Sequence, residues 1–226
     1  MNPLFFLKQL CYVLMLGACF LTLHSATSLA AENESWLENA CPSWSNLSKV
    51  QQKALQDGLK TRKGFVLLFR HFEKDREHCK DDQWIPLTTD GLKKAYNSGE
   101  ILNRNMEIEH AVASPWKRTT DTASLLVLFK KKVDPSDDFK PRFGDFNNLA
   151  DELWKRSKQN PDTNVLAVGH SGKINAFLRN NDEGNRQVGL EEGWSAILRP
   201  VVQKKQFFCD VMIRPDEWPG LFPAKE

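Results

Sequence analysis

A strong charge of either sign is missing from the sequence, and so is any long apolar run beyond its first 30 residues. The 226 residues include 31 lysines and arginines and 29 aspartates and glutamates, a formal net charge of +2. A protein that binds nucleic acid usually carries a strongly basic face, so this balance argues against a nucleic-acid partner. Because no segment after residue 30 has the apolar length that crosses a bilayer, the sequence predicts a soluble mature chain.

The first 30 residues have the pattern of a secretory signal peptide. Lys8 is the only charge before a nearly uniform apolar run from Leu10 to Leu23, and Ser28-Leu29-Ala30 places small residues at the two positions that a signal peptidase reads. We therefore expect this segment to be cleaved and the mature protein to be periplasmic or secreted. Leu16-Gly17-Ala18-Cys19 also resembles a lipoprotein cleavage box, so lipid anchoring through Cys19 is the alternative, although the apolar run continues beyond it.

Cysteine is scarce, and its positions limit the disulfide pattern without fixing it. Two of the five cysteines leave with the signal peptide, and Cys41, Cys79 and Cys209 remain. An exported protein with these cysteines has room for one disulfide and one odd thiol, and the sequence leaves the pair open. Residues 31–226 are enough chain for a single domain with a sizeable core.

Buried strands alternate with amphipathic helices along most of the mature chain. Short apolar runs that end in polar residues predict strands, and apolar residues spaced three or four apart predict helices. This alternation is typical of an α/β fold with a mainly parallel sheet, helices on both faces, and ligands at the carboxyl ends of the strands. Helices are expected over residues 45–60, 88–102, 119–128, 146–154 and after 172, strands over 65–69, 111–113 and 165–168, a hairpin over 194–200 and 206–213, and irregular chain over 130–144 and from 215.

Three of the predicted strands end in residues with chemical use. Arg70 and His71 follow the first strand, Ser114-Pro115 and then Arg118 follow the second, and His170 follows the third. If the three strands are neighbours, two arginines and two histidines meet at one edge of the sheet. The planar guanidinium group matches phosphate oxygens, and a neutral imidazole can attack phosphorus to form a phosphohistidine. The pattern therefore predicts phosphoryl chemistry.

Four segments of the chain resemble the motifs of one family, the histidine phosphatase or phosphoglycerate mutase-like superfamily. The segments are FRHFEK (69–74), LTTDGLKKA (87–95), SPWKRTTDTA (114–123) and VGHSG (168–172), in the order that the family has them. The resemblance covers roughly residues 65–200 and implies a three-layer α/β/α sandwich. It also implies that His71 is the phosphorylated nucleophile, that Arg70, Arg118 and His170 bind the phosphoryl group, and that no metal ion or organic cofactor takes part.

One branch of that family matches the short exported chain in particular. The Arg-His-x-Glu pattern with a signal peptide is similar to the branch that includes lipopolysaccharide core heptose phosphatases. The resemblance implies a small-molecule or glycolipid phosphomonoester as substrate, with another sugar phosphate or a phosphoprotein as alternatives. Two positions depart from the family: Phe72 stands where a small residue is usual, and Ser171 stands where the acid phosphatase branch has an aspartate.

The acid that protonates the leaving group is the open assignment. Such an acid must reach the leaving oxygen and carry a proton, which usually requires a raised pKa. Asp145 lies nearest the region where the mutase-like branch carries its acid, and it is the preferred candidate. Glu73, Asp151 and Glu152 are the alternatives, and a phosphohistidine substrate would need no acid at all.

Other interpretations of these residues are weaker. A serine hydrolase elbow at Gly169-His170-Ser171-Gly172 would need a glycine where Lys173 stands and a histidine further along the chain, and no histidine follows His170. The His78-Cys79 pair fits no zinc pattern and is better explained as part of a polar loop. His110 is expected to face solvent. A protein that binds phosphorylated ligands without turnover remains the alternative from another functional class.

Overall fold

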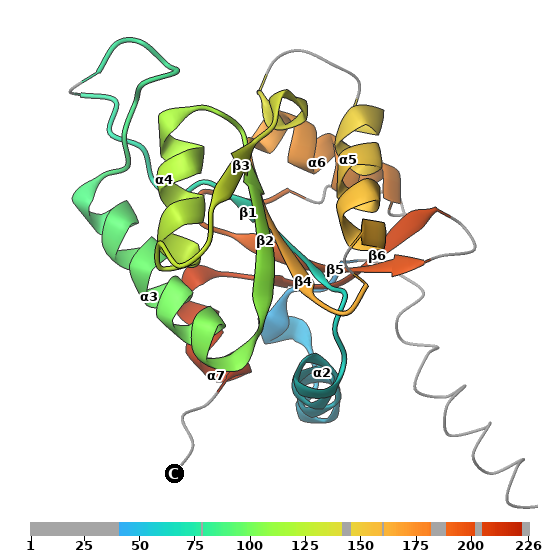
Figure 1. Cartoon of the computed structure of the whole chain (residues 1–226). Helices are drawn as coiled ribbons and strands as arrows, with labels where there is room; N and C mark the ends of the chain where they lie inside the picture. The colour runs from blue at the N-terminus through green and yellow to red at the C-terminus, as the bar shows by residue number, and fades with distance from the viewer. Residues whose placement is uncertain are drawn as a thin grey trace, which may run out of the picture. The chain divides into compact units, whose positions relative to one another are not determined.

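The computed structural model describes residues 41–77, 79–141, 146–159, 161–181, 189–201 and 205–222. Residues 40–226 form one compact unit built on a six-stranded sheet with helices on both faces (Figure 1). The strands are β1 (Val66–Arg70), β2 (Ile108–Ala113), β3 (Val133–Pro135), β4 (Asn164–Gly169), β5 (Ser195–Val201) and β6 (Gln206–Ile213). The helices are α2 (Lys49–Thr61), α3 (Thr89–Asn105), α4 (Lys117–Leu126), α5 (Phe146–Gln159), α6 (Ser171–Asn181) and α7 (Trp218–Leu221).

The sheet is parallel on one side and antiparallel on the other. Its strand order is β3-β2-β4-β1-β5-β6. Strand β4 pairs in parallel with both β1 and β2, and β2 pairs in parallel with β3. Strands β5 and β6 form the predicted antiparallel hairpin, which joins the sheet at the other edge of β1. The expected α/β architecture with a mainly parallel sheet is therefore confirmed.

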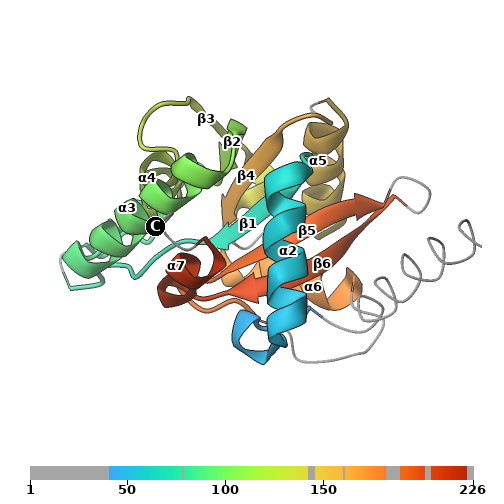
Figure 2. The ribbon, with the colours of Figure 1, turned by 90° about the horizontal axis from the view of Figure 1, so that it is seen from below.

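Strand β1 lies at the centre of the sheet and supplies both of its hydrophobic cores. Leu67 and Phe69 belong to the core on the side of α3 and α4, while Val66 and Leu68 belong to the core on the side of α5 and α6. Figure 1 shows these helices on the two sides of the sheet. All four side chains have no exposed surface. Helices α2 and α7 lie on the first side, where they contribute to the same core (Figure 2). A strand buried on both faces reads as a continuous apolar run, as this one does.

The helix N-termini follow local signals in the sequence. The Thr88 hydroxyl accepts a hydrogen bond from the backbone N–H of Gly91 at 2.9 Å and caps α3, which begins at Thr89, close to its predicted start. At α2, Ser48 and Gln51 form a reciprocal capping box. This box begins the helix at Lys49, four residues later than expected, and the three residues Trp44–Asn46 form a separate 3-10 turn.

Part of the predicted apolar stripe on the first two helices is exposed instead of buried. Val50 on α2 is 78% exposed, and Leu92 and Tyr96 on α3 are 41% and 47% exposed. The buried face of α3 carries small residues such as Ala95 and Gly99, because α4 packs directly against it. Close helix packing, which the apolar period does not encode, therefore sets which face is buried.

Two segments expected to be irregular contain regular structure. Within residues 130–144, β3 adds an edge strand beside β2, and Phe139 in the following 3-10 turn is 1% exposed. In the tail, α7 places Trp218 in the core, where its ring stacks on Phe69 at 5.7 Å between centroids. His110, expected to face solvent, is half-buried on β2. These elements are too short for periodicity to reveal them.

One disulfide and one free thiol are present among the described cysteines. Cys41 and Cys209 are bonded, which ties the start of the described chain to β6, and Cys79 is free. The predicted signal peptide and Cys19 lie outside the described residues. Within the described ranges, no helix combines the length and apolar character that a membrane crossing requires.

The close contact between α3 and α4 predicts opposite effects for two glycine-to-alanine substitutions. A Cβ at Gly99 would lie 2.3 Å from the carbonyl oxygen of Leu125, so Gly99→Ala forces the helices apart and should lower the unfolding free energy by about 1–3 kcal/mol. Gly58 on α2 has open space around it, so Gly58→Ala should raise the unfolding free energy by about 0.5–1 kcal/mol. Urea denaturation measures the unfolding free energy of both variants. An unchanged unfolding free energy for Gly99→Ala would contradict the close packing of α3 on α4.

Candidate active site

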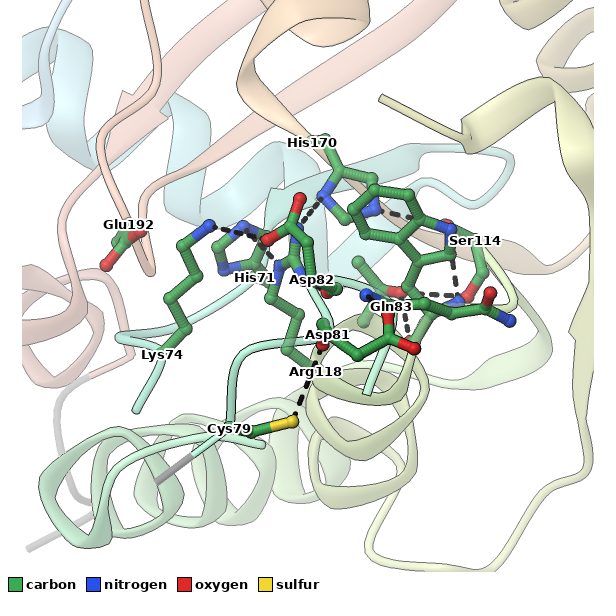
Figure 3. Close-up of polar contacts among 12 residues, drawn as sticks. His71, Lys74, Cys79, Asp81, Asp82, Gln83, Ser114, Arg118, His170 and Glu192 are labelled. Atoms are coloured by element: carbon green, nitrogen blue, oxygen red, sulfur yellow. Dashed lines mark hydrogen bonds and ion pairs between the residues drawn. The ribbon is translucent and has the colours of Figure 1, made fainter. Parts of the chain in front are cut away.

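Three neighbouring strands bring the predicted residues together at one edge of the sheet. Arg70 is the last residue of β1, with His71 next to it, and His170 and Ser114 directly follow β4 and β2. The turns are joined by backbone hydrogen bonds, since the N–H of His71 donates to Gly169 at 3.2 Å and the N–H of Ser114 donates to Val168 at 3.1 Å. Figure 3 shows His71, Arg118 and His170 side by side. The four predicted residues therefore share one site.

The hydrogen bonds of His71 define its tautomer. Its Nδ1 lies 2.8 Å from the carbonyl oxygen of Phe72, which can only accept, so Nδ1 carries the hydrogen. Its Nε2 lies 3.3 Å from Nε of Arg118, which can only donate, so Nε2 carries the lone pair. The side chain is 3% exposed. A neutral imidazole with a fixed orientation thus presents its unprotonated Nε2 to the arginine.

His170 is oriented by the same arginine from the other side. Its Nδ1 lies 3.4 Å from Nη2 of Arg118 and accepts from it, so the hydrogen is on Nε2, which lies 3.1 Å from the Ser114 hydroxyl. The rings of His170 and His71 meet edge to face at 5.3 Å between centroids, and Trp116 packs against His170 at 4.9 Å. The acceptor nitrogens of both histidines therefore face one guanidinium group.

Burial and positive charge keep both histidines neutral. Burial is the main cause that lowers the pKa of His71 to about 3, and the charges of Arg118, Arg70 and Lys74 add to it. Burial likewise lowers the pKa of His170 to about 2, with His71 and the same cations contributing. The hydrogen bond to Phe72 acts in the opposite direction on the pKa of His71, but it is outweighed by burial.

Arg118 is the connecting group of the site. It lies in the first turn of α4, is 2% exposed, and stacks over the Trp116 ring at 4.7 Å. Besides its contacts with both histidines, its Nη1 donates to the backbone oxygen of Asp82, and its Nη2 lies 3.5 Å from the Asp82 carboxylate. Burial lowers the pKa of Arg118 from its usual range, but an arginine remains charged at neutral pH.

Arg70 approaches the site from the end of β1. Its Nη1 donates to the carbonyl oxygen of Leu190 at 2.9 Å, and its Nη2 lies 3.4 Å from the Glu192 carboxylate. Its Nε is buried and makes no hydrogen bond within the described residues. An unpaired buried donor is costly, and an anionic oxygen would satisfy it.

Phe72 does not fill the site, although it replaces a residue that is usually small. Its side chain has no exposed surface and belongs to the core on the α3–α4 side of the sheet. The ring packs on Gly193, where a Cβ would lie 2.8 Å from the Phe72 ring. Gly193 also has φ of +79° and donates a hydrogen bond to the backbone oxygen of His71 at 2.9 Å. The large side chain is thus accommodated by a glycine on the neighbouring loop.

The carboxylates expected to supply the leaving-group acid have other positions. Asp145, the preferred candidate, lies outside the described residues. Glu73 pairs with Lys94 at 2.6 Å. Asp151 is exposed on α5, and Glu152 on the same helix pairs with Arg156 at 2.8 Å. None of these three described carboxylates therefore forms a hydrogen bond or ion pair with His71 or His170.

Several residues of the site were missed at the level of sequence. Ser114 was named at the end of the second strand, and Trp116 lies in the segment SPWKRTTDTA, but neither was given a role. Lys74 ends the segment FRHFEK but was given no role, Asp82 lies in a polar segment with no readable pattern, and Glu192 is far along the chain. His78 lies outside the described residues, and no group of three or more possible metal ligands occurs among those that are described.

A groove with polar and apolar walls lies near the site. Its volume is about 570 Å³, and it shares Glu73 and Glu192 with the surroundings of His71 and Arg70. The other walls come from α3, from the loop before β5 and from the turn before α7, including Lys94, Asn97, Trp194, Arg214 and Asp216. The groove is large enough for the part of a substrate that lies beyond a phosphoryl group.

Comparisons with known structures show the same fold. The protein histidine phosphatase SixA complexed with tungstate aligns with a TM-score of 0.60 and 17% identity, covering 68% of this chain and 98% of that chain. Alpha-ribazole phosphatase from Shigella flexneri aligns with a TM-score of 0.53 and 15% identity, and phosphoserine phosphatase from Entamoeba histolytica in complex with 3-phosphoglyceric acid with 0.53 and 16%. Each of the latter two covers 66% of this chain and 95% of its own.

Sequence comparisons match part of the chain to one family. No curated protein sequence matches it significantly. Residues 66–159 match the family model of the histidine phosphatase superfamily, branch 1. This segment contains Arg70, His71 and Arg118, and His170 follows it at the end of the neighbouring strand. Part of the chain thus matches the histidine phosphatase superfamily, and the chain shares its fold with the phosphatases named above.

Proposed function

We propose that the protein hydrolyses phosphomonoesters through a phosphohistidine on His71, with Arg70, Arg118 and His170 binding the phosphoryl group. One observation carries the proposal: the Arg118 guanidinium faces the unprotonated nitrogens of both His71 and His170, at 3.3 and 3.4 Å. A histidine nitrogen that is neutral, buried and adjacent to a cation is suited to attack an electron-poor phosphorus whose oxygens the cation binds.

The tautomer of His71 determines which nitrogen reacts. Nε2 attacks phosphorus in line, the bond to the leaving oxygen breaks, and the imidazole becomes a cationic phosphohistidine. The Phe72 carbonyl accepts from Nδ1–H and stabilises that cation. Water then attacks phosphorus, the P–N bond breaks, and its electron pair returns to Nε2.

The cations of the site offset the charge of the transferred group. Arg118 and Arg70 have donors for the equatorial oxygens, and the unpaired Nε of Arg70 supplies a donor without breaking an existing bond. The negative charge of a bound phosphoryl group raises the pKa of His170, which makes this side chain a further donor to the oxygens.

For the substrate we propose an exported sugar phosphate, such as a lipopolysaccharide core heptose phosphate. The signal peptide predicted at residues 1–30 and the Cys41–Cys209 disulfide both support an oxidising, exported location. The groove beside Arg70 has carboxylate, amide and ammonium groups from Glu73, Asn97 and Lys94, which suit hydroxyl groups. A small-molecule or glycolipid phosphomonoester fits this site.

A protein phosphohistidine is the second candidate substrate. The likeness to SixA, which is named as a protein histidine phosphatase, favours it. Phosphohistidine also has a good leaving group and needs no strong acid. The two candidates are separated by measuring kcat/KM of the same purified protein with sugar phosphates and with a phosphohistidine peptide.

Trapping the intermediate tests the proposed function. The mature protein is mixed with an aryl phosphate in a single turnover, quenched, and mapped by mass spectrometry. We expect phosphate on His71 and loss of both adduct and turnover in His71→Ala. His110→Ala, which changes a histidine outside the site, should retain both. Absence of turnover and adduct across a panel of phosphomonoesters would contradict the function and favour a protein that only binds phosphorylated ligands.

Arg118→Lys should show that the guanidinium geometry matters beyond its charge. A lysine has no planar fork that contacts both histidines and an oxygen together, so kcat/KM for an aryl phosphate should fall roughly 100- to 1000-fold. Arg199→Lys, a matched change at an arginine paired with Asp210 on the hairpin, should have the activity of the wild type. Equal activity of Arg118→Lys and wild type would contradict the assignment.

The lowered pKa values predict two neutral histidines in mildly acidic solution. NMR of carbon-13-labelled histidine, assigned with His71→Asn and His170→Asn, should show no titration of either imidazole between pH 8 and 5 in the free protein, because their pKa values are about 3 and about 2. The unfolded chain takes up these protons near pH 6.5, so the unfolding free energy falls as the pH decreases below that value. A titration midpoint near 6.5 for either side chain would contradict the buried geometry.

A further inference from the structure

Asp82 is a carboxylate in direct contact with the central arginine. It lies in the segment between β1 and α3 that carries no recognisable motif. Its Oδ1 is 3.5 Å from Nη2 of Arg118 and 3.3 Å from Nζ of Lys74, and its backbone oxygen accepts from Nη1 of Arg118. Figure 3 shows its side chain beside Lys74, His71 and His170. Asp82 thus contacts Arg118, the side chain that contacts both histidines.

The segment that carries Asp82 is held in place by hydrogen bonds on either side of it. Within a turn, Asp81 accepts from the N–H groups of Gln83 and Trp84, at 3.0 and 2.9 Å. The N–H of Lys117, in the first turn of α4, donates to the Gln83 oxygen at 3.0 Å. Because Arg118 is the next residue of that turn, the backbone of Asp82 is positioned relative to the reacting groups.

The exposure of these side chains places Asp82 on the open side of the site. His71 and Arg118 are 3% and 2% exposed, whereas the side chain of Asp82 is 48% exposed. In an in-line displacement the leaving oxygen lies opposite the attacking Nε2 of His71, and the rest of the substrate must extend toward solvent. The open side is therefore where the leaving oxygen needs a proton.

We propose, resting on the phosphohistidine function above, that Asp82 is the acid that protonates the leaving oxygen. The N–P bond forms as the P–O bond breaks, and the proton on Asp82 moves to the leaving oxygen, which departs as an alcohol. In the second step Asp82 takes a proton from the attacking water, and the electron pair of the P–N bond returns to His71. The carboxyl group is then protonated again for the next substrate, so protons and electrons balance over the cycle.

Substrate binding supplies the proton that Asp82 needs. Lys74 and Arg118 stabilise the Asp82 carboxylate, and a phosphoryl group competes for both cations. The negative charge of a phosphoryl group bound beside Asp82 favours the protonated form of the Asp82 carboxyl group. A phosphomonoester has a second pKa of about 6, so a substrate monoanion brings this proton with it near that pH.

Two other carboxylates of the described residues near the site are paired with other cations. Glu192 pairs with Arg70, and Glu73 pairs with Lys94 in the side groove. Neither has a recorded contact with Arg118. Asp82 alone among these three joins the arginine that contacts both histidines.

Leaving-group dependence tests the proposal, because an aryl phosphate has a stable leaving anion and an alkyl phosphate does not. Asp82→Asn keeps the shape and the acceptor oxygen but has no acidic proton. We expect its kcat for an alkyl phosphate such as glycerol 2-phosphate to fall roughly 100- to 10,000-fold, while kcat for 4-nitrophenyl phosphate stays near that of the wild type. The matched variant Asp81→Asn, in the same turn, keeps its acceptor and should behave as the wild type with both substrates.

Three outcomes would overturn the assignment of Asp82. An equal fall of kcat with both substrates would make Asp82 a positioning residue, and an unchanged kcat with a lower KM for both would make it only a competitor for the cations. If the wild-type protein cleaves the aryl phosphate through His71 but cleaves no alkyl phosphate, it has no group that protonates the leaving oxygen, and Asp82 is not such an acid. If the wild-type protein is inactive on both substrates and forms no adduct, the proposed function itself is contradicted. The aryl phosphate tests that function separately, because its cleavage needs His71 but no leaving-group acid.

Discussion

The site depends on one constraint, the burial of an unprotonated His71 between a carbonyl acceptor and a cation. The Phe72 oxygen fixes the hydrogen on Nδ1, and Arg118 faces the lone pair on Nε2. Burial disfavours the imidazolium, so the same environment that orients the ring also keeps it neutral. A bound phosphoryl group reverses that balance, since its negative charge stabilises a cationic phosphohistidine only while the group is attached.

The fold provides this environment through neighbouring strand ends. Strands β1, β4 and β2 lie side by side and parallel, so Arg70, His170 and Ser114 appear at the same edge. Gly193 accepts the Phe72 ring that would otherwise compete for the space behind His71. The site is therefore supported by packing on its inner side, and the side chains of Asp82, Glu192 and Arg70 around it are partly exposed.

The sequence predicted the parts of the structure that strong local signals encode. The apolar run before Arg70, the run before Gly169 and the alternating hairpin all gave correct strands, and the order of the motifs gave the four residues that meet at the site. The apolar periodicity did not predict the buried face of α3, because close packing determines that face. At Gly99 a small residue allows α4 to approach. Periodicity also failed for β3 and α7, which are too short for a pattern.

The residues around the phosphoryl site were the hardest to anticipate. Asp82, which pairs with Lys74, meets Arg118 only because a turn at Asp81 and a backbone hydrogen bond from Lys117 bring the segment to α4. No spacing along the chain encodes that contact. Phe72 departs from the small residue that is usual beside the nucleophile, and its ring lies in the core and not in the site.

The chemical position of phosphorus in the trapped adduct tests the account most directly. Phosphorus-31 and nitrogen-15 NMR of the quenched intermediate distinguishes phosphorus on Nε2 of His71 from phosphorus on Nδ1. The account predicts the Nε2 isomer, because Nδ1 donates its hydrogen to Phe72 and only Nε2 has a lone pair facing Arg118. Phosphorus on Nδ1, or on His170, would contradict the tautomer and the mechanism built on it.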